Sequence, residues 1–223
     1  MSIKNEFIEL MSLKINEIYY SIQGESSYSG LPCVFIRLTY CNLRCSYCDT
    51  EYAFYEGKDL EIKQILKEVN SYKCNLIEIT GGEPLLQKNC ITLIDELEKN
   101  NKKVLIETSG SLSIKNISKN THIILDLKCP SSNMKNKNLW ENLNYINKTD
   151  EIKFVVGDKI DYDWSKKIIK KYDLENKCLL LMSPVYDKID KEKIINWILK
   201  DNLNIRFQIQ LHKEIWDKNK KGV

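Results

Sequence analysis

Three closely spaced cysteines are the residues of this 223-residue chain that point most directly to chemistry. Cys41, Cys45 and Cys48 follow one another with the spacing C-x3-C-x2-C. Thiolates favour zinc, copper(I) and iron–sulfur clusters, so three of them on one short loop can converge on a soft metal centre. A structural zinc site normally has four protein ligands. A four-iron cluster held by three cysteines would instead leave one iron free to bind a small molecule.

Two simpler interpretations of this cysteine loop stay open from the residues alone. Cys33 could complete a structural zinc site, but it precedes the strand that leads into the loop, about five residues or roughly 16 Å from the far end of that strand. Cys45 and Cys48 could act as a redox dithiol, which leaves Cys41 unexplained. We expect most of the other cysteines to be small buried hydrophobic residues; they are Cys33, Cys74, Cys90, Cys129 and Cys178.

The composition is that of a soluble globular protein, with 43% hydrophobic and 29% charged residues. A net charge of +3 with scattered lysines predicts no nucleic-acid partner. The sequence has no run near the ~18 apolar residues of a membrane span and no signal-peptide core, so we expect no membrane partner and a cytoplasmic location. Clustered cysteines in a reducing compartment indicate a metal or catalytic site. We expect residues 1–12 to form an N-terminal extension and residues 13–223 a single domain.

The elements that must position the cysteine loop are strands alternating with helices. Apolar runs predict strands over residues 13–22, 34–39, 76–80, 104–107, 122–127, 152–156, 178–182 and 205–211. Helical spacing predicts helices over residues 61–72, around 91–97, and over about 139–146, 164–172 and 191–199. This alternation implies right-handed crossovers and a mainly parallel sheet. About six or seven core strands are too few for a closed eight-stranded barrel, so we predict an α/β fold of the open, partial TIM-like barrel type.

Polar residues follow four of the predicted strands at their carboxyl ends. They are the cysteine loop, Thr80–Glu83, Glu107–Gly110 and Asp126–Lys128. The carboxyl ends of parallel strands meet at one mouth, where ligands bind in such folds. The sequence therefore predicts one shared ligand site there.

The cysteine loop, together with the run Gly81-Gly82-Glu83-Pro84, resembles the signature of the radical S-adenosylmethionine (SAM) superfamily. The resemblance implies that the amino and carboxylate groups of SAM bind the free iron of a [4Fe–4S] cluster. Glycines allow a ligand to approach the backbone, although a strand-ending turn is the simpler interpretation of the glycine pair. The residues that the resemblance implies at the SAM site are Tyr47, Cys48, Asp49, Gly82, Glu83, Ser109, Asp126, Leu127 and Lys128.

Further segments resemble the 7-carboxy-7-deazaguanine synthase family from about residue 13 to residue 216. They are Ser21–Glu25, Phe35–Leu38, Cys48–Thr50, Asp126–Ser132 and Gln208–Lys213. The implied reaction converts 6-carboxy-5,6,7,8-tetrahydropterin to 7-carboxy-7-deazaguanine with loss of ammonia, on the route to 7-deazaguanine bases such as queuosine. In that mechanism the reduced cluster cleaves SAM, and the resulting radical takes a hydrogen atom from C6 of the pterin. The cluster and SAM carry this chemistry, so no side chain is assigned as catalytic.

The same resemblance implies roles for residues around the pterin. Arg37 would pair with its carboxylate, where a guanidinium makes two parallel bonds. Thr50 would ligate Mg²⁺, which prefers oxygen ligands, although a threonine there could equally serve a turn. His212 is one of two histidines, and an isolated histidine is more often structural. The implied substrate-binding residues are Ile22, Gln23, Gly24, Glu25, Arg37, Thr80, Gln210 and His212.

The resemblance also implies partners: a flavodoxin- or ferredoxin-like electron donor and a second copy of the chain in a homodimer. Two other functions stay open. An activase of a glycyl-radical enzyme shares the cysteine spacing, although such activases are not expected to carry the other segments. A non-enzymatic zinc-binding module would need only the thiols.

Overall fold

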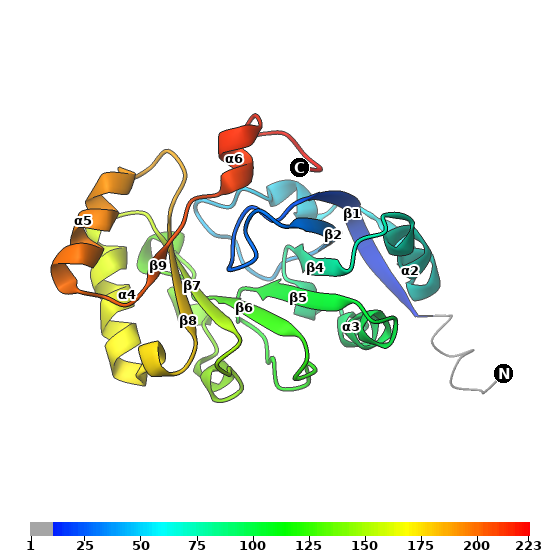
Figure 1. Ribbon diagram of the computed structural model, residues 1–223, viewed down its shortest axis with the longest axis horizontal. Coiled ribbons are helices and arrows are strands. Elements are labelled where there is room, and N and C mark those ends of the chain that lie inside the picture. The colour runs from blue at the N-terminus through cyan, green and yellow to red at the C-terminus, as the bar shows by residue number, and fades with distance from the viewer. Residues whose placement is uncertain (1–10) are drawn as a thin grey trace.

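A single nine-stranded sheet is the frame of the protein in the computed structural model, which describes residues 11–223 (Figure 1). The strand order is β3-β1-β2-β4-β5-β6-β7-β8-β9. The strands are β1 (Ser12–Ile22), β2 (Pro32–Leu38), β3 (Lys58–Glu61), β4 (Leu76–Gly81), β5 (Lys103–Thr108), β6 (His122–Asp126), β7 (Glu151–Val156), β8 (Leu179–Pro184) and β9 (Arg206–Phe207). Most of the predicted N-terminal extension, residues 1–10, lies outside the described residues, and Ser12 already belongs to β1.

The sheet is parallel over most of its width. β2 and β4 to β9 pair in parallel, while β1 and β3 add an antiparallel edge. The order leaves β3 and β9 unpaired with each other, so the sheet stays open. The predicted α/β fold with an open, partial barrel of mainly parallel strands is confirmed.

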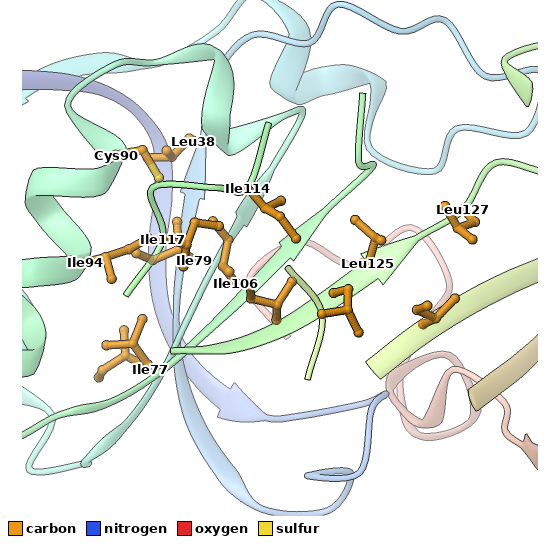
Figure 2. Packing of buried hydrophobic residues seen from close by; sticks show 14 of the residues in the cluster. Leu38, Ile77, Ile79, Cys90, Ile94, Ile106, Ile114, Ile117, Leu125 and Leu127 are labelled. Atoms are coloured by element: carbon orange, nitrogen blue, oxygen red, sulfur yellow. The ribbon is translucent and has the colours of Figure 1, made fainter. Parts of the chain in front are cut away.

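Helices cover the outer face of the sheet (Figure 1). They are α2 (Ile62–Ser71), α3 (Cys90–Lys99), α4 (Lys159–Tyr172) and α5 (Lys191–Asp201). The short α6 (Leu211–Ile215) lies apart from them, and its residues His212 and Lys213 line the cavity on the inner face. Side chains alternate between the two faces of a strand. On β4, Ile77 and Ile79 pack with Ile94 of α3 in the apolar core (Figure 2). Glu78 and Thr80 therefore point to the inner face, away from the helices.

Three predicted elements differ from the structure. The helix predicted over 139–146 is a short 3-10 helix, Trp140–Asn144. The strand predicted over 205–211 is wrong beyond the two residues of β9, because Gln208 and Gln210 bond with the loop after β1 and a helix begins at Leu211. The helix predicted over about 164–172 begins earlier, as α4, at Lys159. There the Asp158 side chain accepts a hydrogen bond from the Asp161 backbone. The edge strand β3 was not predicted.

None of the helices within residues 11–223 is long and apolar enough to cross a bilayer.

Candidate active site

A cavity of about 790 Å³ opens on the inner face of the sheet. Its wall includes residues from β1, β2, β4, β5, β6, β7 and β8, together with the cysteine loop and the C-terminal segment. Every residue predicted for the site lines this cavity except Glu83 and Leu127. Leu127 lies in the apolar core, and its backbone N–H donates to the Lys153 carbonyl at 2.9 Å. The structure therefore brings together the four polar strand ends.

The cysteine loop directly follows β2 at the cavity wall. The Cys41, Cys45 and Cys48 thiols are free and half-buried, and burial raises the pKa of each. Cys33 is fully buried near the start of β2, at the other end of the strand, and does not line the cavity. Among residues 11–223, no three His, Cys, Asp or Glu side chains form a group that could hold a single metal ion. Three thiols on one loop at a large cavity suit a polynuclear, sulfur-ligated cofactor.

The glycine pair after β4 lies directly against the start of the cysteine loop. A Cβ atom at Gly82 would lie 2.2 Å from the Tyr40 carbonyl oxygen and 2.8 Å from the Cys41 Cβ atom. The Glu83 backbone N–H donates to the same carbonyl at 2.9 Å. Glycine is required here because any side chain would displace the first cysteine. Gly82 and Cys41 both line the cavity, so the Gly82 backbone is accessible from it.

Glu83 organises the neighbouring strand end from a fully buried position. Its carboxylate accepts hydrogen bonds from the Thr108 hydroxyl at 2.7 Å and the Ser109 backbone N–H at 2.9 Å, and also from the Ser109 hydroxyl. The family resemblance places Glu83 at the SAM site. In the structure it instead faces Thr108 and Ser109, and Ser109 is the residue of this group that lines the cavity.

The end of β6 supplies a buried ion pair to the cavity. The Lys128 ammonium lies 2.7 Å from one carboxylate oxygen of Asp126. Burial opposes the charge of Lys128, but Asp126 and Cys45 outweigh it and raise the pKa of the lysine. The other Asp126 oxygen, Oδ1, is buried and has no hydrogen-bond partner within residues 11–223. A buried acceptor without a partner fits a ligand that donates a hydrogen bond from the cavity.

The middle of the cysteine loop rests on the segment after β6. Ser46, between Cys45 and Cys48, donates from its backbone to the Ser132 carbonyl at 3.1 Å and from its hydroxyl to the Ser131 carbonyl. Asp161 of α4 is fully buried and accepts from the Ser131 backbone N–H and the Gly157 N–H, both at 2.8 Å, and from the Ser131 hydroxyl. Asp161 thus supports the loop through one intervening segment.

Replacing Asp161 with asparagine should loosen the cysteine loop. The amide can accept at only one of its two positions, so at least one buried donor loses its partner, at a cost of about 1.5–3 kcal/mol in unfolding free energy. We expect iron to be lost faster to a chelator from the reconstituted variant, measured by the decay of visible absorbance. Asp163→Asn is the matched control, because Asp163 pairs with an exposed lysine on the same helix. Equal iron loss from both variants would show that Asp161 does not support the loop.

The loop between β1 and β2 crosses the open side of the sheet (Figure 1). The Leu211 backbone N–H donates to the Gly24 carbonyl at 2.9 Å, and the Ser26 N–H donates to the Gln208 side chain at 2.8 Å. A Cβ atom at Gly24 would lie 2.2 Å from His212 Nδ1, so this contact requires glycine. Burial lowers the pKa of His212. The β1–β2 loop and the segment after β9 therefore close the open side of the sheet.

A group of buried charges at the cavity floor includes two residues, Glu78 and Lys153, that were not predicted as part of the site. The Lys153 ammonium on β7 forms ion pairs with Glu25 and with Glu107, at 2.8 Å for Glu107. Burial raises the pKa of Glu78 well above its ordinary value, and the negative charges of Glu107 and Glu25 add to this. Burial also raises the pKa of Glu107, whereas Lys153 outweighs burial at Glu25 and lowers its pKa. Charged residues inside apolar strands are the sequence signal that could have found Glu78 and Lys153.

Arg37 already has protein partners. Its Nε lies 2.7 Å from a Glu17 oxygen, and its Nη2 donates to the Tyr19 hydroxyl at 2.9 Å. Nη1 makes no hydrogen bond within residues 11–223 and belongs to a side chain that lines the cavity. The side chain is thus held in place by β1 and keeps a donor for a ligand.

Thr50 and the C-terminal segment form the mouth of the cavity. The Thr50 hydroxyl donates to Asp49 at 2.9 Å, and Lys213 pairs with the other Asp49 oxygen at 2.6 Å. Burial opposes ionisation of Asp49, but Lys213 outweighs it and lowers the pKa. Residues 218–223 also line the cavity, which the sequence did not reveal.

Comparison with known proteins defines the class first. Residues 35–198 match the Radical SAM superfamily, so the chain belongs to that superfamily. A curated 7-carboxy-7-deazaguanine synthase of Koribacter versatilis is 41% identical, with 95% of this chain and 100% of the relative covered. A synthase of the same name from Chlorobaculum tepidum is 39% identical over 95% of this chain and 97% of its own length. The chain belongs to the 7-carboxy-7-deazaguanine synthase family.

Solved structures support the fold. The crystal structure of QueE from Escherichia coli superposes with a TM-score of 0.78 at 24% identity, covering 95% of this chain and 99% of that one. Streptococcus suis SuiB is similar at a TM-score of 0.55 and 20% identity, over 77% of this chain and 46% of its own. Neither the glycyl-radical activase nor the zinc-binding module is favoured by these relatives.

Proposed function

We propose that this chain is a radical SAM lyase that converts 6-carboxy-5,6,7,8-tetrahydropterin to 7-carboxy-7-deazaguanine with loss of ammonia, in 7-deazapurine biosynthesis. The observation that carries the proposal is its match, over almost its whole length, to curated synthases of that name. The cavity supports it, because thiols, a glycine turn and a charged floor line one space.

The cofactor end of the cavity would hold a [4Fe–4S] cluster and SAM. Cys41, Cys45 and Cys48 would ligate the cluster, which with SAM supplies the radical that abstracts hydrogen from the substrate. The close packing of Gly82 against the cysteine loop and the unpartnered Asp126 oxygen support this assignment. The residues we propose to contact SAM are Tyr47, Asp49, Gly82, Ser109, Asp126 and Lys128, all of which line the cavity.

The substrate end would hold the pterin between the β1–β2 loop and the segment after β9. Arg37 offers its free Nη1 to the substrate carboxylate, held in place by Glu17. Glu25, ionised beside Lys153, accepts hydrogen bonds from ring N–H groups. Thr50 would ligate Mg²⁺ together with substrate oxygens, a role supported by its place at the cavity mouth. Ile22, Gln23, Gly24, Thr80, Gln210 and His212 would form the remaining wall.

The family resemblance supports three further parts of the proposal. A flavodoxin- or ferredoxin-like protein would deliver the electron, the chain would act as a homodimer, and the enzyme would work in the cytoplasm.

An anaerobic assay tests the function. The reconstituted protein is incubated with SAM, a chemical reductant and 6-carboxytetrahydropterin, with and without Mg²⁺, and the products are identified by mass spectrometry. We expect 7-carboxy-7-deazaguanine and ammonia, with SAM not consumed in proportion to product. Iron and sulfide analysis is made on the same sample. A fully loaded cluster that forms no deazaguanine would refute the assignment, and zinc without iron would refute the enzyme class.

A further inference from the structure

Glu78 is the buried acid at the cavity floor to which neither the sequence nor the family signature assigns a role. It lies in the middle of β4, is only 2% exposed, and still lines the cavity. Its one hydrogen bond within residues 11–223 comes from the Gln23 side-chain amide to Oε2. None of the ion pairs in that part of the chain includes Glu78. The other oxygen, Oε1, therefore has no partner from the protein.

Charge balance at the cavity floor indicates that Glu78 is the uncharged acid. Glu25, Glu78 and Glu107 are close enough to interact, and Lys153 is the cation in contact with two of them, Glu25 and Glu107. Two carboxylates sharing one ammonium leave no compensation for a third buried charge, which is costly without a partner. The other groups around Glu78 are Tyr19 on β1 and Cys33 and Arg37 on β2. Arg37 is in contact with Glu17 rather than Glu78.

Gln23 connects the neutral acid, Glu78, to the ionised acid, Glu25. Its amide nitrogen donates to Glu78, while its amide oxygen accepts from the Glu25 backbone N–H at 2.7 Å. Gln23 is 3% exposed and both ends of its amide are occupied. The family resemblance implies that Gln23 binds the substrate. The geometry makes it a positioning residue that links the Glu78 carboxyl group to the backbone of Glu25.

We infer that Glu78 is a specificity-determining residue that donates a hydrogen bond from its uncharged carboxyl group to the ring carbonyl of the pterin. The inference rests on the proposed function. An aminopyrimidinone ring presents N–H donors next to a carbonyl acceptor. The ionised Glu25 suits the donors, and a neutral acid beside it suits the carbonyl. Burial and the two neighbouring negative charges raise the pKa of this carboxyl group, which favours its uncharged form.

The test measures binding to the anaerobically reconstituted holoenzyme by titration calorimetry. Two stable probes are used: 6-carboxypterin, which has the ring carbonyl and the adjacent N3–H, and 2,4-diaminopteridine-6-carboxylate, in which an amino group replaces the carbonyl and N3 carries no hydrogen. The wild type should prefer the carbonyl compound by about tenfold or more, because the amino group leaves a buried donor unpaired. Glu78→Gln keeps an uncharged donor and should retain the affinity and the preference. Glu78→Ala and Glu78→Leu should reduce the preference to the part that the contact between Glu25 and the ring N–H contributes.

The outcomes separate the inference from the function. Unchanged preference in Glu78→Ala or Glu78→Leu, or a Glu78→Gln variant that binds as weakly as Glu78→Ala, would overturn the role of Glu78 while leaving the enzyme assignment intact. A wild-type holoenzyme that neither binds the carbonyl probe nor forms product would overturn the proposed function and the inference together. Thermal unfolding of each variant shows that it is folded before titration.

Discussion

Lys153→Met should destabilise the protein by about 3–5 kcal/mol and abolish pterin binding, the largest effect of a single substitution that we expect. The substitution removes the ammonium that contacts Glu25 and Glu107 and leaves the buried acids at the cavity floor without a paired cation. Methionine fills a similar volume, so the loss reflects charge rather than packing. Urea unfolding of the cluster-free protein measures the change in free energy.

A second lysine provides the control for that experiment. Lys159 forms an ion pair with Asp163 on the exposed surface of α4. Lys159→Met should change the unfolding free energy by less than about 1 kcal/mol, because exposed pairs contribute little. Adding Glu107→Gln to Lys153→Met should restore part of the lost stability by removing one of the unpaired charges. Equal stability of Lys153→Met and the wild type would contradict the charge balance described for the cavity floor.

Gly82→Ala should disrupt the cysteine loop and lower cluster retention by about 10- to 100-fold. The new methyl group would overlap the Tyr40 carbonyl oxygen and the Cys41 Cβ atom, so the loop that carries the first thiol must move. Overpacking of this kind also costs about 1–3 kcal/mol in unfolding free energy. Iron and sulfide per chain after reconstitution measure cluster retention, and urea unfolding measures the change in unfolding free energy.

The control for Gly82→Ala is Ser113→Ala, at an exposed position after β5. It should reconstitute as the wild type does. If Gly82→Ala bound a full complement of iron with the wild-type spectrum, the close packing between the glycine turn and the cysteine loop would have no part in holding the cluster.

The parallel core of the fold was predictable because its strands are buried on both faces and therefore read as continuous apolar runs. The edge was not. β3 reads Lys-Asp-Leu-Glu, is largely exposed and pairs only with β1, so it has no apolar pattern to detect. The segment after β9 does alternate, as a strand does. Its glutamines are committed to side-chain contacts with a loop about 185 residues earlier, which local sequence cannot show.

The cofactor side of the cavity was easier to predict than its floor. Cys41, Gly82 and Lys128 follow strand ends, where a polar residue interrupts an apolar run. Glu78 and Lys153 lie inside strands, and only the alternation of faces reveals that they point into the cavity rather than into the core. The burial of Glu83 could not be predicted, because its bonds to Thr108 and Ser109 join a motif residue to a strand end about 25 residues later.

The closure of the open side by two distant segments has a consequence for biosynthesis. Ser26 and Gln208 are 182 residues apart in sequence, and Glu25 and Gln210 are 185 apart. On a ribosome that adds 5–20 residues per second, the second segment emerges about 10–40 s after the first. The cysteine loop and the strands around it are complete well before that time. A nascent chain therefore has its three thiols in an open cavity, and the wall that residues 208–211 contribute can form only after this segment has left the ribosome.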